Sequence, residues 1–388
     1  MRAKPVRALA MLLAVSICTL AFAATSLGII AALLGRNTAG TRDFVQYWGA
    51  GKQLLHHSDP YNATALLPIE RAVGYPPGMK AAIMANPPTA LPLVAPLGLV
   101  GAKSGHLLWF VLSLICLIAS VRIIWTLHGR PVEHLRWLGY SFAPVLSCLL
   151  SGQVTLFILF GLALFLRFHR TKPFIAGLSL WFCLLKPHLF LPFGIVLLAW
   201  IVTTRSYRIL TGALSSLVIS GALAFLLDQS AWTQYIAMMR SARIDKIFIP
   251  CLSIVLRQHL GHALWPQYLP AVAGCLWATI YFKRHQAEWN WIEHGSLLML
   301  VSVLVAPYTW IMDQAILLPA MLHAAYSTQS KTHIAILALA SAIIEIEILA
   351  GIPLLTSALY LWTAPAWLLW YALATRKPLR GKLAYQTT

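Results

Sequence analysis

Long apolar stretches, separated by short polar segments, recur along the whole chain. Most have about 15 to 27 residues, and a helix of roughly 20 apolar residues crosses a hydrocarbon core about 30 Å thick. The pattern therefore predicts an all-α polytopic membrane protein with about 10 to 12 transmembrane helices, in which residues 1–388 form a single membrane-embedded domain. The predicted spans lie near residues 8–34, 104–127, 137–150, 154–168, 173–185, 189–204, 209–227, 266–282, 295–307, 315–327, 333–350 and 356–374.

The composition supports this interpretation. Of 388 residues, 59% are hydrophobic and 10% are charged, whereas an ordinary soluble domain has roughly 25% charged residues. The net charge of +18 would favour a nucleic-acid partner in a soluble protein, but here the basic residues form short clusters between apolar spans. In that position they set membrane topology, so we expect no nucleic-acid partner.

The distribution of Lys and Arg predicts the orientation in the membrane. The apolar run 8–34 has 27 residues, which is longer than a secretory signal, and we interpret it as an uncleaved anchor with a cytoplasmic N-terminus. Of the 29 basic residues, 18 then fall in short cytoplasmic segments, and most of the others are spread over two long outer loops, 36–103 and 228–265. The positive-inside bias thus predicts a multi-pass protein with both termini in the cytoplasm.

Three breaks interrupt the apolar pattern at the predicted outer ends of spans, at Ser151-Gly152-Gln153, Lys186-Pro187-His188 and Ala306-Pro307-Tyr308-Thr309-Trp310. Irregular backbone at membrane depth is tolerated only where protein or water satisfies it, so we expect the breaks to line one outward cavity. In the first outer loop, Leu91 to Val100 is apolar but too short to span. This segment predicts a helix in or against the interface.

Asp43 is the strongest candidate for chemistry. It lies nine residues after the end of the first apolar run, beside Gln46, Tyr47 and Trp48. A carboxylate at the membrane surface is well placed to take a proton from a hydroxyl while a lipid substrate stays in the bilayer. The alternative is an ordinary solvated loop carboxylate with interface aromatics beside it.

Cations occur at a similar predicted depth. Lys186 and His188 flank Pro187, where a cation can meet a lipid phosphate, although a lysine that only reaches toward the interface has the same pattern. Arg257 in the second outer loop is a further phosphate candidate. Asp313 either binds substrate hydroxyls or pairs with one of these cations.

Two glutamates and six cysteines remain. Glu345 and Glu347 lie near the outer end of their predicted span and point to different helical faces, which is not the arrangement of an acid/base pair. They either line a cavity or reach for the interface. The cysteines are scattered without C-x-x-C spacing, and the histidines show no metal-ligand spacing, so we predict neither a metal site nor a cofactor.

An ordered set of motifs carries a family resemblance. The chain resembles glycosyltransferase family 87, the polyprenyl-phosphate-mannose-dependent α-mannosyltransferase-like membrane proteins of the GT-C superfamily. The matching motifs, in family order, are Asp43-Phe-x-x-Tyr47-Trp-x-Ala-Gly51, Asp59-Pro60-Tyr61, Tyr75-Pro-Pro, Pro87-Pro88, Gly152-Gln153, Lys186-Pro187, Pro307-Tyr308-x-Trp310-x-x-Asp313 and Leu317-Leu318-Pro319.

The resemblance implies a hexosyltransferase of the bacterial plasma (inner) membrane with its active site on the outer, periplasmic side. The donor would be a polyprenyl-phosphate sugar, the acceptor a glycolipid or envelope glycan, and the base an acidic residue at the position of Asp43. It does not fix the acceptor or the sugar, because family members that act on mycobacterial glycolipids tend to carry histidines where this chain has Met312 and Asp313. The expected substrate-binding residues are Tyr47, Trp48, Gln153, Tyr308, Trp310 and Asp313.

The implied reaction needs no nucleotide and therefore no Rossmann-type glycine-rich loop, and the sequence contains none. Direct displacement would invert the anomeric centre, with Lys186, His188 or Arg257 stabilising the departing phosphate. Two other classes also need a polar path in the membrane. They are a lipid or polysaccharide transporter or flippase, disfavoured because no internal repeat is visible, and a noncatalytic envelope-assembly subunit.

Overall fold

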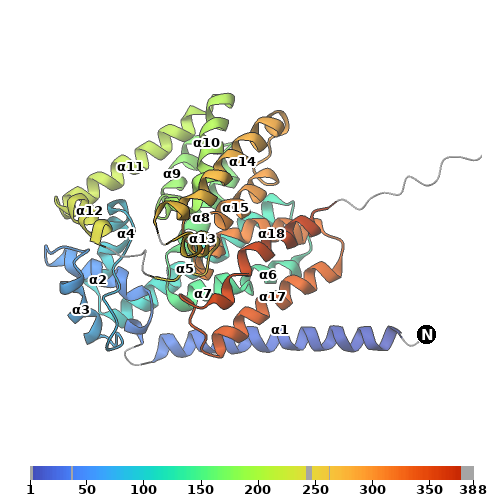
Figure 1. Cartoon of the computed structure of the whole chain (residues 1–388), viewed down its shortest axis with the longest axis horizontal. Helices are drawn as coiled ribbons and strands as arrows, with labels where there is room; N and C mark the ends of the chain where they lie inside the picture. The colour runs from blue at the N-terminus through green and yellow to red at the C-terminus, as the bar shows by residue number, and fades with distance from the viewer. Residues whose placement is uncertain (1–2, 36–37, 242–246, 262, 377–388) are drawn as a thin grey trace, which may run out of the picture.

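The computed structural model describes residues 3–35, 38–241, 247–261 and 263–376, and every regular element in these ranges is a helix (Figure 1). The first nine α-helices are α1 (Ala3–Leu34), α2 (Phe44–Leu55), α3 (Ala63–Ala72), α4 (Leu91–Val94), α5 (Ala102–Leu127), α6 (Trp137–Tyr140), α7 (Ala143–Ser151), α8 (Thr155–Phe168) and α9 (Pro173–Cys183). They are followed by α10 (Leu191–Thr204), α11 (Tyr207–Leu227), α12 (Ala231–Ser241), α13 (Leu252–His259), α14 (Leu269–His285), α15 (His294–Leu304), α16 (Leu318–Ser327), α17 (Lys331–Leu349) and α18 (Thr363–Ala374).

Short 3₁₀-helices connect or extend many of these elements. They are η1 (Ala39–Thr41), η2 (Pro88–Ala90), η3 (Ala95–Leu99), η4 (Glu133–Arg136), η5 (Pro187–Phe190), η7 (Trp265–Tyr268), η8 (Gln286–Glu288), η9 (Ile311–Leu317) and η10 (Ala358–Tyr360). Several begin with proline in the first turn, where its missing N–H costs no intrahelical hydrogen bond.

The prediction of an all-α polytopic membrane protein is confirmed. Five helical segments in the described chain are long and apolar enough to cross a bilayer: Met11–Leu34, Ala102–Leu127, Pro187–Thr204, Tyr207–Leu227 and Lys331–Leu349. Each of the other predicted spans contains a shorter helix. Large apolar side chains stay exposed along the outside of these helices, such as Val218 on α11 with 69% of its surface accessible. That exposure fits lipid contact and not water.

The predicted breaks shorten several of these helices. Gly152 ends α7 with φ of +75°, a left-handed conformation that glycine adopts without strain. A Cβ at this position would also lie 2.8 Å from the Cβ of Phe44. Two features therefore require glycine at position 152: the left-handed turn and the close approach of α2.

The first outer loop packs onto the end of the bundle as a cap. Gly98 of η3 lies so close to α2 that an added Cβ would be 2.2 Å from the carbonyl oxygen of Gly51. The apolar segment predicted at the interface is helical, with Leu91 and Val94 fully buried against the rest of the protein. It acts as packing between α2 and α11.

The described parts of the two loops that are predicted to be outer lie at the same end of the molecule. Tyr61 of the first loop contacts Tyr235 of the second, with ring centroids 5.5 Å apart. In Figure 1, α2, α3, α4 and α12 gather on the left, whereas α1 begins and α18 ends toward the right.

Candidate active site

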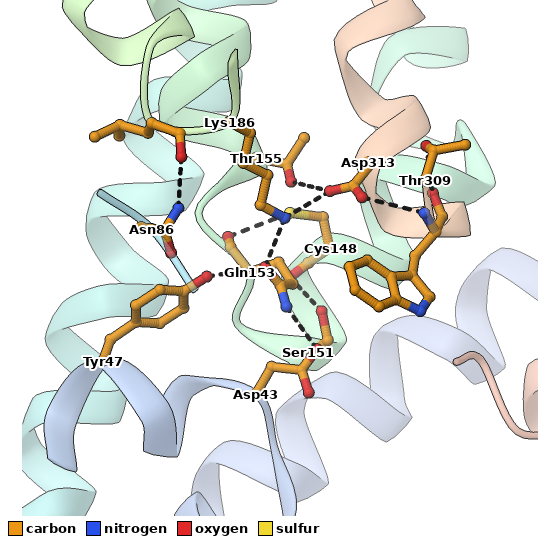
Figure 2. A network of polar contacts seen from close by, with 12 residues as sticks. Asp43, Tyr47, Asn86, Cys148, Ser151, Gln153, Thr155, Lys186, Thr309 and Asp313 are labelled. Atoms are coloured by element: carbon orange, nitrogen blue, oxygen red, sulfur yellow. Dashed lines mark hydrogen bonds and ion pairs between the residues drawn. The ribbon is translucent and has the colours of Figure 1, made fainter. Parts of the chain in front are cut away.

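The side-chain amide of Gln153 connects three segments that are far apart in the sequence (Figure 2). Its Oε1 accepts hydrogen bonds from Tyr47 Oη at 2.9 Å and from Lys186 Nζ at 3.0 Å. Its Nε2 donates to Asp43 Oδ2 at 2.8 Å. Because the two donors need an acceptor and the carboxylate needs a donor, this network fixes which way the amide points.

Lys186 and Asp313 form a buried ion pair, with Nζ 2.6 Å from Oδ1. Asp313 has none of its surface exposed, and Lys186 has 8%. The carboxylate accepts two more hydrogen bonds, from Thr155 Oγ1 to Oδ1 at 3.1 Å and from the Trp310 backbone N–H to Oδ2 at 3.1 Å. Charge-assisted bonds from three donors offset the cost of burying this carboxylate, and they join the breaks before α8, η5 and η9.

Asp43 differs in its surroundings. It is the residue before α2, a position where Asp often caps the helix, but its side chain makes no capping bond and instead accepts from Gln153. The residue is partly exposed, and none of the described residues donates to its Oδ1. Burial raises the pKa of Asp43, while the Gln153 hydrogen bond and the charge of Lys186 oppose that shift.

Aromatic packing holds α2 in place beside the network. The ring of Tyr47 stacks on Trp109 of α5, with centroids 5.0 Å apart and an interplanar angle of 24°. Trp109 in turn donates from Nε1 to the carbonyl oxygen of Gly152 at 2.8 Å. The residues around Asp43 are therefore set by contacts with both α5 and the break between α7 and α8.

The sequence that builds this geometry also matches a known family. The sequence profile of glycosyltransferase family 87 matches residues 85–328, more than half of the chain. The chain belongs to glycosyltransferase family 87. The predicted resemblance is confirmed, and the family identifies a membrane glycosyltransferase. No curated protein and no solved structure gives a significant match.

Only some residues of the site in this family 87 glycosyltransferase lie within the matched range. Gln153, Lys186 and Asp313 fall inside it, whereas Asp43 and Tyr47 precede it. The carboxylate with the free oxygen thus comes from the first outer loop, and the buried ion pair comes from the part of the chain that matches the family.

Three other predicted residues form an aromatic group beside the ion pair. His188 stacks on Tyr308, with centroids 3.9 Å apart and an angle of 27°, and Tyr308 meets Trp310 edge-on at 5.6 Å. Within the described chain, His188 Nε2 and Trp310 Nε1 are buried without a hydrogen-bond partner. These two nitrogens therefore have unused hydrogen-bonding capacity.

The polar groups of Trp48 and Arg257 form hydrogen bonds within the protein. Trp48 donates from Nε1 to the Val100 carbonyl oxygen at 3.0 Å and so helps to close the first outer loop. The Nη1 of buried Arg257 donates to Gln267 Oε1 at 2.6 Å, and Gln267 donates to the Pro307 carbonyl oxygen at 2.9 Å. Arg257 thereby supports the turn that carries Tyr308.

Three residues that belong to the site or hold it in place were not predicted from the sequence. Thr155 binds Asp313, and its signal was a hydroxyl two residues after the predicted Gly152-Gln153 break. Asn86 donates to the Leu185 carbonyl oxygen at 2.8 Å and so holds the residue before Lys186. Arg42 lies directly before Asp43, partly exposed, and its buried Nε has no partner within the described chain.

Glu345 lies apart from the network. It is buried on α17, which packs against α1, and its Oε2 has no hydrogen-bond partner among the described residues. Of the two predicted alternatives, reaching for the interface does not fit a side chain that is 2% exposed. Across the described residues, no group of three or more His, Cys, Asp or Glu could hold a metal ion.

Proposed function

We propose that this glycosyltransferase moves a sugar, mannose, from a polyprenyl-phosphate donor to a hydroxyl of a lipid-linked or envelope glycan acceptor, with inversion. The observation that carries the proposal is the asymmetry of Asp43, whose Oδ2 is held by Gln153 while its Oδ1 has no donor within the described chain. A fixed carboxylate with one free oxygen in a partly exposed position has the geometry of a general base.

In the proposed step, Asp43 Oδ1 takes the proton of the acceptor hydroxyl as its oxygen bonds to the anomeric carbon. The bond from that carbon to the phosphate oxygen breaks on the opposite face, and the electron pair leaves with the polyprenyl phosphate. The anomeric configuration inverts because one displacement occurs. Burial that raises the pKa of Asp43 makes it a stronger base than an exposed aspartate.

Lys186 is proposed to contact the departing phosphate. An ammonium group has three N–H donors, and the pairs with Gln153 and Asp313 use two of them. The third is left for a phosphate oxygen. His188, with its free Nε2, is proposed as a second phosphate contact, and Arg257 as a third.

The remaining polar and aromatic groups are proposed to hold the sugar and the acceptor. Trp310 offers an indole N–H, Tyr308 and Trp48 offer ring faces, and Tyr47 and Gln153 keep Asp43 in position. Asp313 is proposed to act through Lys186, because it is fully buried and forms an ion pair with that lysine, with Nζ 2.6 Å from Oδ1.

We further propose that the enzyme lies in the bacterial plasma membrane with both termini in the cytoplasm and the site on the outer side. The positive-inside bias supports this orientation. The arrangement in Figure 1 is compatible with it, since the start of α1 and the end of α18 lie opposite the loops that carry Asp43.

The experiment is a transfer assay with the purified protein in liposomes. Radiolabelled mannosyl phosphopolyprenol and a lipid extract from the native host are supplied, with the glucosyl donor as the comparison. The proposal expects label in a product lipid whose new anomeric configuration is opposite to that of the donor. Label that stays entirely in both donors would overturn the transfer, and equal use of both sugars would overturn the assignment of mannose.

A further inference from the structure

The helical segment that carries Asp313 is unusual in its length and its burial. η9 runs for seven residues as a 3₁₀-helix, and all seven are buried. Runs of more than about three or four residues are uncommon in this conformation, because its hydrogen-bond geometry is poorer than that of an α-helix. η9 therefore depends on contacts from its neighbours to keep its shape, and Asp313 depends on η9 for its position.

Gln314, the residue after Asp313, makes such a contact on another side of η9. Its Nε2 donates to Thr363 Oγ1 at 2.8 Å, and its Oε1 accepts from Trp367 Nε1 at 2.8 Å. Both partners belong to α18, the last helix of the described chain. Successive residues of a 3₁₀-helix point about 120° apart, so Asp313 can meet Lys186 on one side of η9 while Gln314 meets α18 on another.

The direction of each hydrogen bond in this series is fixed. An indole N–H can only donate, so Trp367 sets which end of the Gln314 amide faces it. The other end then donates to Thr363, whose own hydroxyl donates to the Tyr360 carbonyl oxygen at 2.7 Å. Gln314, Thr363 and Trp367 are each 2% exposed or less. Every group in the series thus has a partner, which is the condition under which a buried polar network makes its surroundings rigid.

Aromatic packing supports the same contact. Trp367 meets Phe142 edge-on, with ring centroids 5.1 Å apart and an interplanar angle of 63°. Phe142 directly precedes α7, the helix that ends at the Gly152 break, and α7 packs against η9. The side chains of α18 therefore contact both η9 and the start of the helix that leads to Gln153.

We propose that Gln314 is a positioning residue for the transfer reaction. The contact of its amide with α18 fixes η9, and η9 keeps Asp313 where it pairs with Lys186. The inference rests on the proposed function for the role of Lys186 at the donor phosphate. It adds that α18, which lies beyond the residues that match the family profile, is required for the geometry of the site.

This role differs from a contribution to stability alone. Lys186 is proposed to contact the donor phosphate, whereas the acceptor hydroxyl meets Asp43 at the other end of the network. A displaced ion pair should therefore weaken the use of the donor. A general loss of stability should instead lower the amount of folded enzyme and leave both KM values unchanged.

The first test removes the hydroxyl of Thr363 and compares the two substrates. Thr363→Val keeps the shape of the side chain but leaves Gln314 Nε2 buried without its acceptor. KM for mannosyl phosphopolyprenol should rise about tenfold, which corresponds to about 1.4 kcal/mol, while the apparent KM for the host lipid extract stays within about twofold. Thr363→Ser, which keeps the hydroxyl, should have the wild-type donor KM.

Two further variants bracket this result. Trp367→Phe removes the indole N–H from the other end of the amide and keeps a ring against Phe142, so it should also raise the donor KM. Thr279→Val is the matched control, because the Thr279 hydroxyl donates within its own helix, to the Cys275 carbonyl oxygen. It should change neither KM.

Hydrogen exchange separates the inference from the transfer reaction. The backbone amides of residues 311–317 should exchange about tenfold faster in Thr363→Val than in the wild type, whereas those of α11 should keep the wild-type rate. This measurement decides whether α18 fixes η9 even if no polyprenyl-phosphate sugar is transferred. Equal exchange of η9 in the wild type and Thr363→Val, or a donor KM that Thr363→Val leaves unchanged, would overturn the inference.

Discussion

Asp43 and Asp313 stand at the two ends of one hydrogen-bonded network and have opposite surroundings. Asp313 is fully buried, pairs with Lys186 and accepts three hydrogen bonds. Asp43 is partly exposed and accepts one side-chain hydrogen bond, from Gln153. A carboxylate whose two oxygens are both held by buried donors maintains geometry, whereas one with an oxygen free of any donor can take a proton. The same residue type therefore has two roles, set by its environment.

The difference reflects where each residue lies in the fold. Asp313 enters the bundle on η9, between α15 and α16, and its side-chain partners come from α8 and from the residue directly before η5. Asp43 lies on a loop that caps the bundle, next to Arg42, which is also partly exposed. Rigid helix ends fix the buried pair, and the cap leaves one oxygen of Asp43 open.

The largest effect on stability is expected from Asp313→Ala. The substitution leaves the Lys186 ammonium buried without its counter-charge, which typically costs about 3 to 5 kcal/mol. Unfolding of the purified variant in detergent should show this loss, with Asp43→Ala as the matched control that removes a carboxylate from the other end of the network. If both variants have the same free energy of unfolding as the wild type, the buried pair does not stabilise the structure.

Replacing both partners should cost less than the two single changes predict. In Lys186→Met with Asp313→Leu, no buried charge remains unpaired, although Gln153 and Thr155 lose hydrogen-bond partners at about 1 to 3 kcal/mol. A double-mutant cycle should therefore show a coupling of a few kcal/mol between the two sites. Strictly additive losses would mean that the two charges act independently.

Glu70 offers a contrasting carboxylate in the first outer loop. One oxygen accepts from the Ala82 N–H at 3.1 Å, the other is buried without a partner in the described chain, and burial raises the pKa of Glu70 to about 7. The folded state then holds a proton that the unfolded state releases near pH 4.5. Stability should fall as pH rises from about 4.5 to 7 and stay lower above it.

Glu70→Gln removes this titration. The free energy of unfolding of the variant should vary less with pH over that window than that of the wild type, by up to about 2 to 3 kcal/mol. Denaturant unfolding at pH 5 and pH 8 measures the difference, and Glu133→Gln, at an exposed position, is the control. If stability depends on pH in the same way in the wild type and in Glu70→Gln, the titration of Glu70 does not cause that dependence.

A smaller effect is expected on how the transfer rate depends on pH at the acid side of the profile. Asp43 acts in its ionised form, so activity should fall as pH falls through its pKa, which burial raises above the ordinary value for Asp of about 3.9. Gln153→Leu removes a hydrogen bond that lowers the pKa of Asp43, so the fall in activity should begin at a higher pH than in the wild type. If activity of Gln153→Leu falls at the same pH as in the wild type, the titrating group is not Asp43.

The sequence predicted much of this architecture because its signals are local. Apolar runs mark the helices, and the Gly152, Lys186-Pro187 and Pro307 breaks mark the points where polar residues enter. Residues placed at similar predicted depth do come together in the structure, in one network centred on Gln153.

The pairings within the network were not predictable in the same way. Lys186 and Asp313 are 127 positions apart, and the periodicity of the chain does not indicate which cation meets which carboxylate. For Asp313, pairing with a cation was one of two alternatives, and the structure contains that pair. The contact between Gln314 and α18 also depends on how two helices meet, so it has no local signal.

The assignment of Asp43 as the base is tested most directly by sugar transfer with purified Asp43→Asn. Asparagine keeps the size and an acceptor oxygen for Gln153 but cannot take the acceptor proton. Turnover should fall by about 10² to 10⁴, while donor binding and the unfolding midpoint stay at the wild-type values. Transfer by Asp43→Asn at a rate close to wild type would contradict the assignment of Asp43 as the general base.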